Sequence, residues 1–131
     1  MKPSMKSLSV ATALSIAMLA TSGIAHAGDC LDVKLKFMNN LSSKIKVKKV
    51  EIGGNNGTWK EDIANQQILT GGEYTTNGRR MNKLDSGATP SFMKVEYDQW
   101  NAPNNKWDAK TKNFTNRQEC KDGHTYNFNI Q

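Results

Sequence analysis

The feature that most constrains the fold of this chain is a strict two-residue alternation of apolar and polar side chains. In segment 31–37 every second residue is apolar and the residues between are charged. Segment 124–130 repeats the pattern, with Tyr126, Phe128 and Ile130 in one phase. Successive side chains of a strand point to opposite faces, so this period predicts strands with one buried face.

Turn-forming residues divide the rest of the chain into further short segments. Further strands are expected at 44–52, 58–60, 66–69, 73–77, 91–100 and 107–114, and a loop at 78–90. Short strands separated by turns rich in Gly, Pro and Asn are typical of antiparallel sandwiches and barrels. The sequence therefore predicts an all-β, immunoglobulin-like sandwich of about seven strands, with a small β-barrel as the alternative.

Two segments break the regular pattern. In 44–52 the first and last apolar pairs are out of phase, and the extra residue falls at Lys48-Lys49, which predicts a β-bulge. Segment 58–70 has capping-box spacing between Thr58 and Glu61, but its apolar residues do not gather on one helical face. Strands are therefore favoured over a helix in 58–70.

The N-terminus predicts a cleaved secretory signal peptide over residues 1–27. A basic head, an apolar core over 8–20 and Ala25-His26-Ala27 are the three parts of such a signal. The alternative, a retained membrane anchor, needs an apolar span of about 20 residues, and this core is shorter. We expect Gly28 to begin one mature domain, 28–131, in the bacterial periplasm or the medium.

The mature chain has two cysteines, Cys30 and Cys120. An even pair in an exported chain predicts a disulfide. The bond would close a loop of about 90 residues and stabilise the fold by about 4–5 kcal/mol in the chain-entropy model.

Motifs for catalysis and cofactor binding are missing from the sequence. One histidine, His124, follows the signal segment, and no GxSxG, CxxC or phosphate-binding glycine loop is present. The adjacent acids Glu61 and Asp62 would point apart on a strand. We therefore expect a non-enzymatic protein without cofactor or metal, and place His124 on the surface. The alternative is a hydrolase built around His124.

Lysines dominate the first half of the mature chain. Without residues 1–27, which hold Lys2 and Lys6, 16 of the 18 basic residues and all 12 acidic residues remain, a net charge of +4. Pairing of strands 31–37 and 44–52 around the turn would align four lysines on one face: Lys34, Lys36, Lys46 and Lys48. Such a face would attract anions. Alternatively, lysines guard exposed strands against aggregation.

Two tryptophans flank a six-residue turn, 101–106. Simple hairpin pairing places Trp100 opposite Trp107, and the phase of Trp100 puts it on the polar face. Two adjacent exposed indoles would form a contact platform for a sugar or a partner side chain. Alternatively, both rings close the end of the core.

These features predict an exported binding module for an anionic envelope component, either glycan or lipid, or for a partner protein. The expected ligand-binding residues are Lys34, Lys36, Lys46, Lys48, Trp100 and Trp107. Nucleic acid is disfavoured, because stacking of bases needs several aromatic side chains on the basic face. The alternative function is a small secreted effector, either a membrane-active toxin or an enzyme inhibitor.

Overall fold

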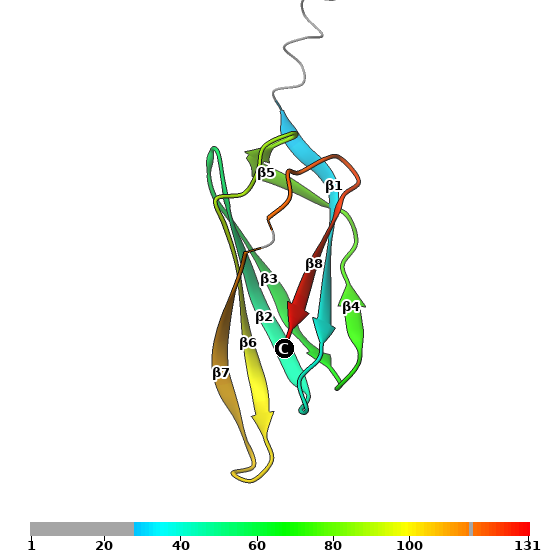
Figure 1. Ribbon diagram of the computed structural model, residues 1–131, viewed down its shortest axis with the longest axis vertical. Helices are drawn as coiled ribbons and strands as arrows, with labels where there is room; N and C mark the ends of the chain where they lie inside the picture. Colours follow the sequence, from blue (N-terminus) through cyan, green and yellow to red (C-terminus); the bar gives the residue numbers. More distant parts are fainter. Residues whose placement is uncertain (1–27, 116) are drawn as a thin grey trace, which may run out of the picture.

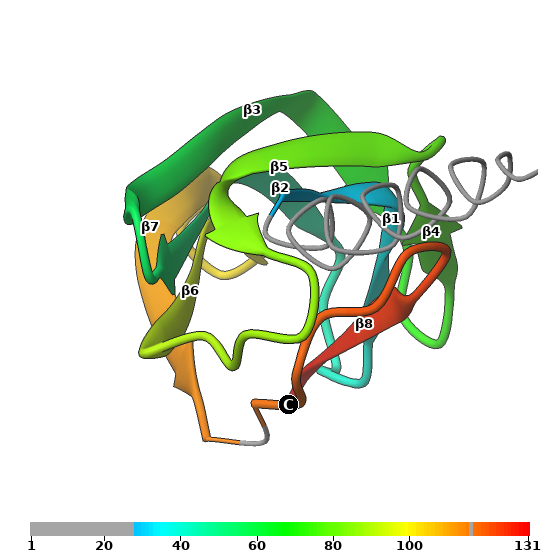
Figure 2. The ribbon, with the colours of Figure 1, turned by 90° about the horizontal axis from the view of Figure 1, so that it is seen from above.

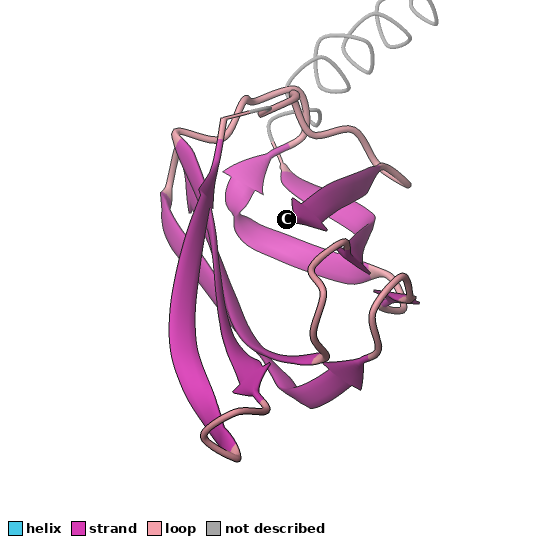
Figure 3. Cartoon of the chain, turned by 60° about the horizontal axis from the view of Figure 1, so that its bottom comes forward, coloured by secondary structure: helices cyan, strands magenta, loops and turns pink. Residues whose placement is uncertain are grey.

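The computed structural model describes residues 28–115 and 117–131, so the expected signal peptide lies outside the described residues. All its elements are strands (Figure 3). They are β1 (Asp29–Asn39), β2 (Ile45–Gly54), β3 (Gly57–Ile68), β4 (Glu73–Thr75), β5 (Arg79–Asp85), β6 (Phe92–Asn101), β7 (Lys106–Phe114) and β8 (Thr125–Ile130). Within these ranges no helix is long and apolar enough to cross a membrane.

The strands form two layers, which confirms the predicted sandwich (Figures 1 and 2). One sheet has the order β3-β2-β6-β7 and is antiparallel throughout. In the other, β1 pairs with β4 and β5 in the antiparallel sense and with β8 in the parallel sense. The described strands number eight, against about seven expected.

The core lies between the two sheets and is built by the alternation seen in the sequence, except at Leu31. Leu31 is exposed, because the register of β1 shifts between Cys30 and Val33, where Asp32 has a φ of 54°. Phe37 of β1 stacks on Phe128 of β8, with ring centroids 5.1 Å apart. Phe114 of β7 meets Phe128 edge-on at 5.2 Å and so links the two sheets. Each large buried side chain of this kind stabilises the fold by about 1.5–3 kcal/mol.

The expected hairpin between segments 31–37 and 44–52 does not form, and this prediction was wrong. β1 and β2 lie in opposite sheets, and the connection between them crosses from one layer to the other. Asn39, fully buried, holds this crossing. Its side-chain amide donates hydrogen bonds to the carbonyl oxygens of Ser43 (2.9 Å) and Ile68 (3.0 Å). These bonds give the two carbonyl oxygens a hydrogen-bond partner, which in a hairpin would be a backbone N–H of the adjacent strand.

The bulge expected in β2 is confirmed, because the register against β3 and β6 shifts between Val47 and Lys49. The preference for strand over helix in 58–70 is also confirmed, but β3 is one continuous strand. Ala64 and Asn65 both have φ of 53°. These two left-handed residues change the phase of β3 without ending it.

Part of the loop expected at 78–90 is in fact a strand, β5. Two residues of β5, Met81 and Leu84, are fully buried. They are three residues apart and lie among charged residues, so the sequence shows no two-residue alternation there.

The predicted disulfide joins Cys30 at the start of β1 to Cys120 in the segment before β8. Both cysteines are fully buried. The bond therefore anchors the long connection between β7 and β8 to the second sheet.

Candidate functional site

The candidate site lies on the outer face of the β3-β2-β6-β7 sheet, where the β6–β7 hairpin projects beyond the other strands (Figure 1). Trp100 and Trp107 occupy directly opposed positions on this hairpin, as predicted. Their ring centroids are 5.1 Å apart at an interplanar angle of 62°, an edge-to-face contact. Both rings are half-buried and point away from the core, in the phase opposite to Val95 and Tyr97.

Two lysines of the neighbouring chain segment lie over these indoles. The Nζ of Lys44 is 5.0 Å from the ring centroid of Trp100 and 5.5 Å from that of Trp107. The Nζ of Lys46 is 4.2 Å from the centroid of Trp107. A backbone hydrogen bond from Trp100 N to Lys44 O (3.0 Å) fixes this alignment. We call Lys44, Lys46, Trp100 and Trp107 the tryptophan–lysine end.

The ammonium groups of the tryptophan–lysine end have no ion-pair partner in the part of the chain that the structure describes, although Asp98 lies opposite Lys46 on β6. Among the described residues, neither Lys44 nor Lys46 forms an ion pair within 4.0 Å. The carboxylate of Asp98 on the same face lies 3.4 Å from Lys48 and is engaged there. Cation–π contact holds an ammonium group in place without neutralising it. The two ammonium groups are therefore held over the indoles with their charge intact.

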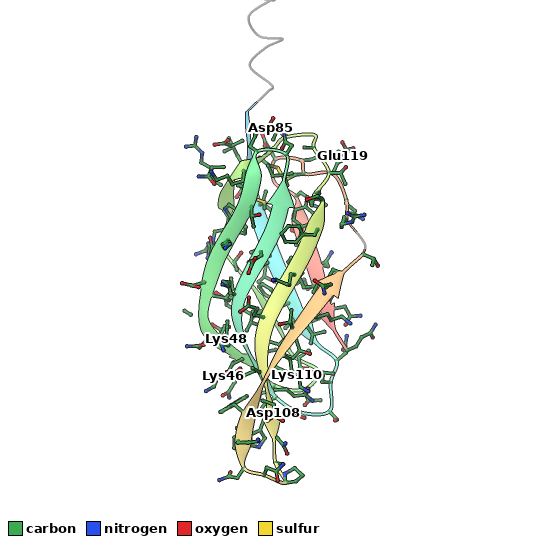
Figure 4. The ribbon with its side chains drawn as sticks, turned by 90° about the vertical axis from the view of Figure 1, so that its left-hand side faces the viewer. Lys46, Lys48, Asp85, Asp108, Lys110 and Glu119 are labelled. Atoms are coloured by element: carbon green, nitrogen blue, oxygen red, sulfur yellow. A yellow bond between two sulfur atoms is a disulfide. The ribbon has the colours of Figure 1, made fainter. Side chains whose placement is uncertain are left out.

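The predicted binding residues divide between the two sheets, so the continuous lysine face was wrong. Lys46 and Lys48 lie toward the same end of β2 (Figure 4), and Lys46 lies over the Trp107 ring. Lys34 and Lys36 lie on β1, in the opposite sheet, and pair with carboxylates. The Nζ of Lys34 is 3.6 Å from Asp32 and that of Lys36 is 3.4 Å from Glu73. The cause is the crossing after β1, which separates lysines that a hairpin would have aligned.

Lys44 is the site residue that the sequence reasoning missed. It precedes β2, but it shares the parity of Lys46 and therefore the same face. The two-residue spacing between Lys44 and Lys46 was the signal in the sequence that could have predicted this shared face.

The middle of the same outer face has a different arrangement, which we call the charge ladder: Lys49, Glu51, Lys94 and Glu96. The Nζ atoms of Lys49 and Lys94 lie 3.6 and 3.7 Å from the Glu51 carboxylate. Lys49 also reaches Glu96 at 3.8 Å. Burial raises the pKa of Glu51, but the ammonium groups of Lys94, Lys49 and Lys60 outweigh this effect and hold the pKa below its usual value.

His124, expected on the surface, lines an open surface hollow but is only partly exposed. It is half-buried immediately before β8, and its ring meets Tyr126 edge-on at 4.7 Å. Its Nε2 is buried without a hydrogen-bond partner among the described residues. In the same ranges, His, Cys, Asp and Glu form no group of three or more that could hold a metal ion.

Comparison with protein-family models, curated proteins and solved structures found no match. The β-sandwich by itself serves many unrelated functions. The function must therefore be inferred from the chemistry of the site.

Proposed function

We propose that this protein is an exported, non-enzymatic binding module that recognises an anionic glycan of the cell envelope through its tryptophan–lysine end. One observation carries the proposal. The ammonium groups of Lys44 and Lys46 are held over two half-buried indoles with no carboxylate partner among the described residues.

The paired lysines favour an anionic ligand. Two like charges on neighbouring side chains repel each other, and a carboxylate, phosphate or sulfate group between them would remove that repulsion. The attraction acts at the surface, so added salt screens it. Binding is therefore expected to weaken as ionic strength rises.

The indoles favour a sugar over a lipid surface. Trp100 and Trp107 offer flat apolar area beside the charges, which suits the C–H faces of a pyranose ring. Insertion into a bilayer needs an exposed apolar or amphipathic element. The exposed large apolar residues of the described chain, Leu31, Leu69 and Phe92, lie outside the tryptophan–lysine end.

The buried disulfide supports an oxidising compartment. Together with the expected signal peptide, it supports export to the bacterial periplasm or medium.

The test is a tryptophan-fluorescence titration of the oxidised protein with a polyuronate, at low and at high salt. Trp59 is buried but lines a separate hollow, so the Trp107→Ala variant is titrated in parallel to separate the change at the tryptophan–lysine end from any change at Trp59. The proposal expects a saturable change that high salt abolishes, and none with a neutral glucan of equal length. An equal response to the neutral glucan would contradict it.

Two further samples separate the alternatives. Vesicles with and without anionic lipid test a lipid ligand, and an envelope protein extract passed over immobilised protein tests a protein partner. Binding to the vesicles without response to the polyuronate would contradict the glycan assignment, as would salt-resistant capture of one protein with no response to the polyuronate.

A further inference from the structure

A second positively charged surface lies at the opposite end of the molecule, in an open hollow of about 730 Å³ between β3 and β5. Asp85, at the end of β5, marks this end in Figure 4, far from Lys46. The hollow is lined by Thr58, Trp59, Lys60, Arg80, Asn82 and Lys83. The hollow is broad and open to solvent, so a group bound there would stay partly exposed.

The turn between β2 and β3 is locked onto β5, which fixes the two walls of the hollow. Asn56 donates a backbone hydrogen bond to the Lys83 carbonyl oxygen at 2.9 Å. The side-chain amides of Asn55 and Asn56 donate to the two carboxylate oxygens of Asp85 at 2.8 and 2.9 Å. A Cβ on Gly54 would lie 2.0 Å from the Lys83 carbonyl oxygen, so only glycine permits this approach.

The cations of the hollow are only partly balanced by carboxylates. Arg80 pairs with Asp29 at 2.7 Å. Neither Lys60 nor Lys83 lies within 4.0 Å of a carboxylate among the described residues. Three cations on a locked framework therefore line the space, with Asp29 paired to Arg80, Glu51 opposite Lys60 on β2, and Asp85 bonded to the locked turn as the neighbouring carboxylates.

The lining also supplies neutral hydrogen-bonding groups, the Thr58 hydroxyl and the Asn82 amide. An oxyanion with several oxygens needs such donors in addition to cations, because each oxygen accepts more than one hydrogen bond. Arginine adds a planar fork that matches phosphate and sulfate geometry.

We propose that this hollow is a second anion site, which binds a phosphate or sulfate group carried by a glycan. The hollow and the tryptophan–lysine end share no residues. The two proposals can therefore be tested independently of each other. Two anion sites at opposite ends would let one molecule contact an extended polymer at two points or join two polymer chains.

Amide chemical shifts of the oxidised protein, titrated at low salt with inorganic sulfate and with a sulfated disaccharide, test the proposal. We expect saturable shifts at Thr58, Lys60, Asn82 and Lys83, with tighter binding of the disaccharide. The Lys60→Gln and Lys83→Gln variants should each bind about tenfold more weakly. Lys121→Gln is the matched control, because it removes the same charge outside the hollow.

The Trp107→Ala variant distinguishes the two sites, because it alters only the tryptophan–lysine end. The amide chemical-shift changes of the residues that line the hollow should be the same in this variant as in the wild type. Equal affinity for inorganic sulfate and the disaccharide would overturn the glycan assignment. Unsaturable shifts, or loss of binding in Lys121→Gln equal to that in Lys83→Gln, would overturn the site. Shifts confined to the tryptophan–lysine end would overturn it and leave the first proposal intact.

Discussion

The charge ladder and the tryptophan–lysine end lie on the same face of the same sheet, yet their lysines have different partners. In the ladder, Lys49 and Lys94 reach the carboxylate of Glu51 within 3.7 Å. At the tryptophan–lysine end, Lys44 and Lys46 rest on indole rings instead. A count of lysines does not distinguish these two regions.

The difference teaches that the partner of a lysine decides its role. A carboxylate partner neutralises the ammonium group, so the ladder has little attraction left for a ligand anion. An indole partner positions the group and leaves its charge intact. The ladder is therefore expected to affect stability, and the tryptophan–lysine end to affect binding.

The largest effect is expected from removing the Cys30–Cys120 disulfide, which tests whether the charge ladder and the tryptophan–lysine end depend on this bond in the opposite sheet. Replacing Cys30 and Cys120 by Ala should lower the free energy of unfolding by up to about 4–5 kcal/mol, because the unfolded chain regains its loop entropy. Denaturant unfolding measures the loss. Polyuronate binding by the population that stays folded should be unchanged, and loss of binding in folded protein would tie the site to the disulfide.

The next effect concerns Trp107, which contacts both lysines of the tryptophan–lysine end, whereas Trp100 contacts Lys44. Trp107→Ala should weaken polyuronate binding by about tenfold or more, because it removes contact area, releases Lys46 and leaves Lys44 in contact with Trp100 alone. Trp100→Ala is the matched comparison and should weaken binding less. Isothermal titration measures both, and an equal loss in the two variants would argue against positioning by the indoles.

In the charge ladder the expected effect falls on stability. Glu51→Gln should lower the free energy of unfolding by about 1 kcal/mol, since two lysines lose their shared partner. Polyuronate binding should be unchanged. Glu73→Gln, which breaks the exposed pair with Lys36, serves as the control and should have a smaller effect. A clear change in binding by Glu51→Gln would mean that the two regions are not separate.

The smallest expected effect is a pH dependence of the same contribution. The pKa of Glu51 is lower in the folded protein, so its stabilisation is present above the unfolded pKa and disappears as pH falls through the folded pKa. The stability difference between the wild type and Glu51→Gln should therefore vanish in acid. Denaturant unfolding from neutral to acidic pH measures this difference, and a difference independent of pH would contradict the assignment.

Local pattern was sufficient to predict several parts of the molecule. The alternation at 31–37 and 124–130 predicted β1 and β8, and the phase slip at Lys48-Lys49 predicted the bulge in β2. Hairpin pairing at a short turn predicted the opposed tryptophans. Each of these features depends on residues that are close in sequence.

Partners distant in sequence could not be predicted in the same way. A short turn after β1 is compatible with a hairpin or with a crossing between sheets, and the choice depends on contacts such as Asn39 with Ile68. One signal was available: Asn39 continues the inward phase of Phe37, and a polar residue on the buried face needs backbone partners. The wrong partner for β1 produced the wrong lysine face.

The most direct measurement compares two double variants with equal change in charge. Lys44→Gln/Lys46→Gln alters the tryptophan–lysine end, and Lys34→Gln/Lys36→Gln alters the opposite sheet. Polyuronate affinity at low salt should fall by about tenfold or more in the first and by no more than about twofold in the second. An equal fall in both would show that net charge, and not the indole-held lysine pair, determines binding.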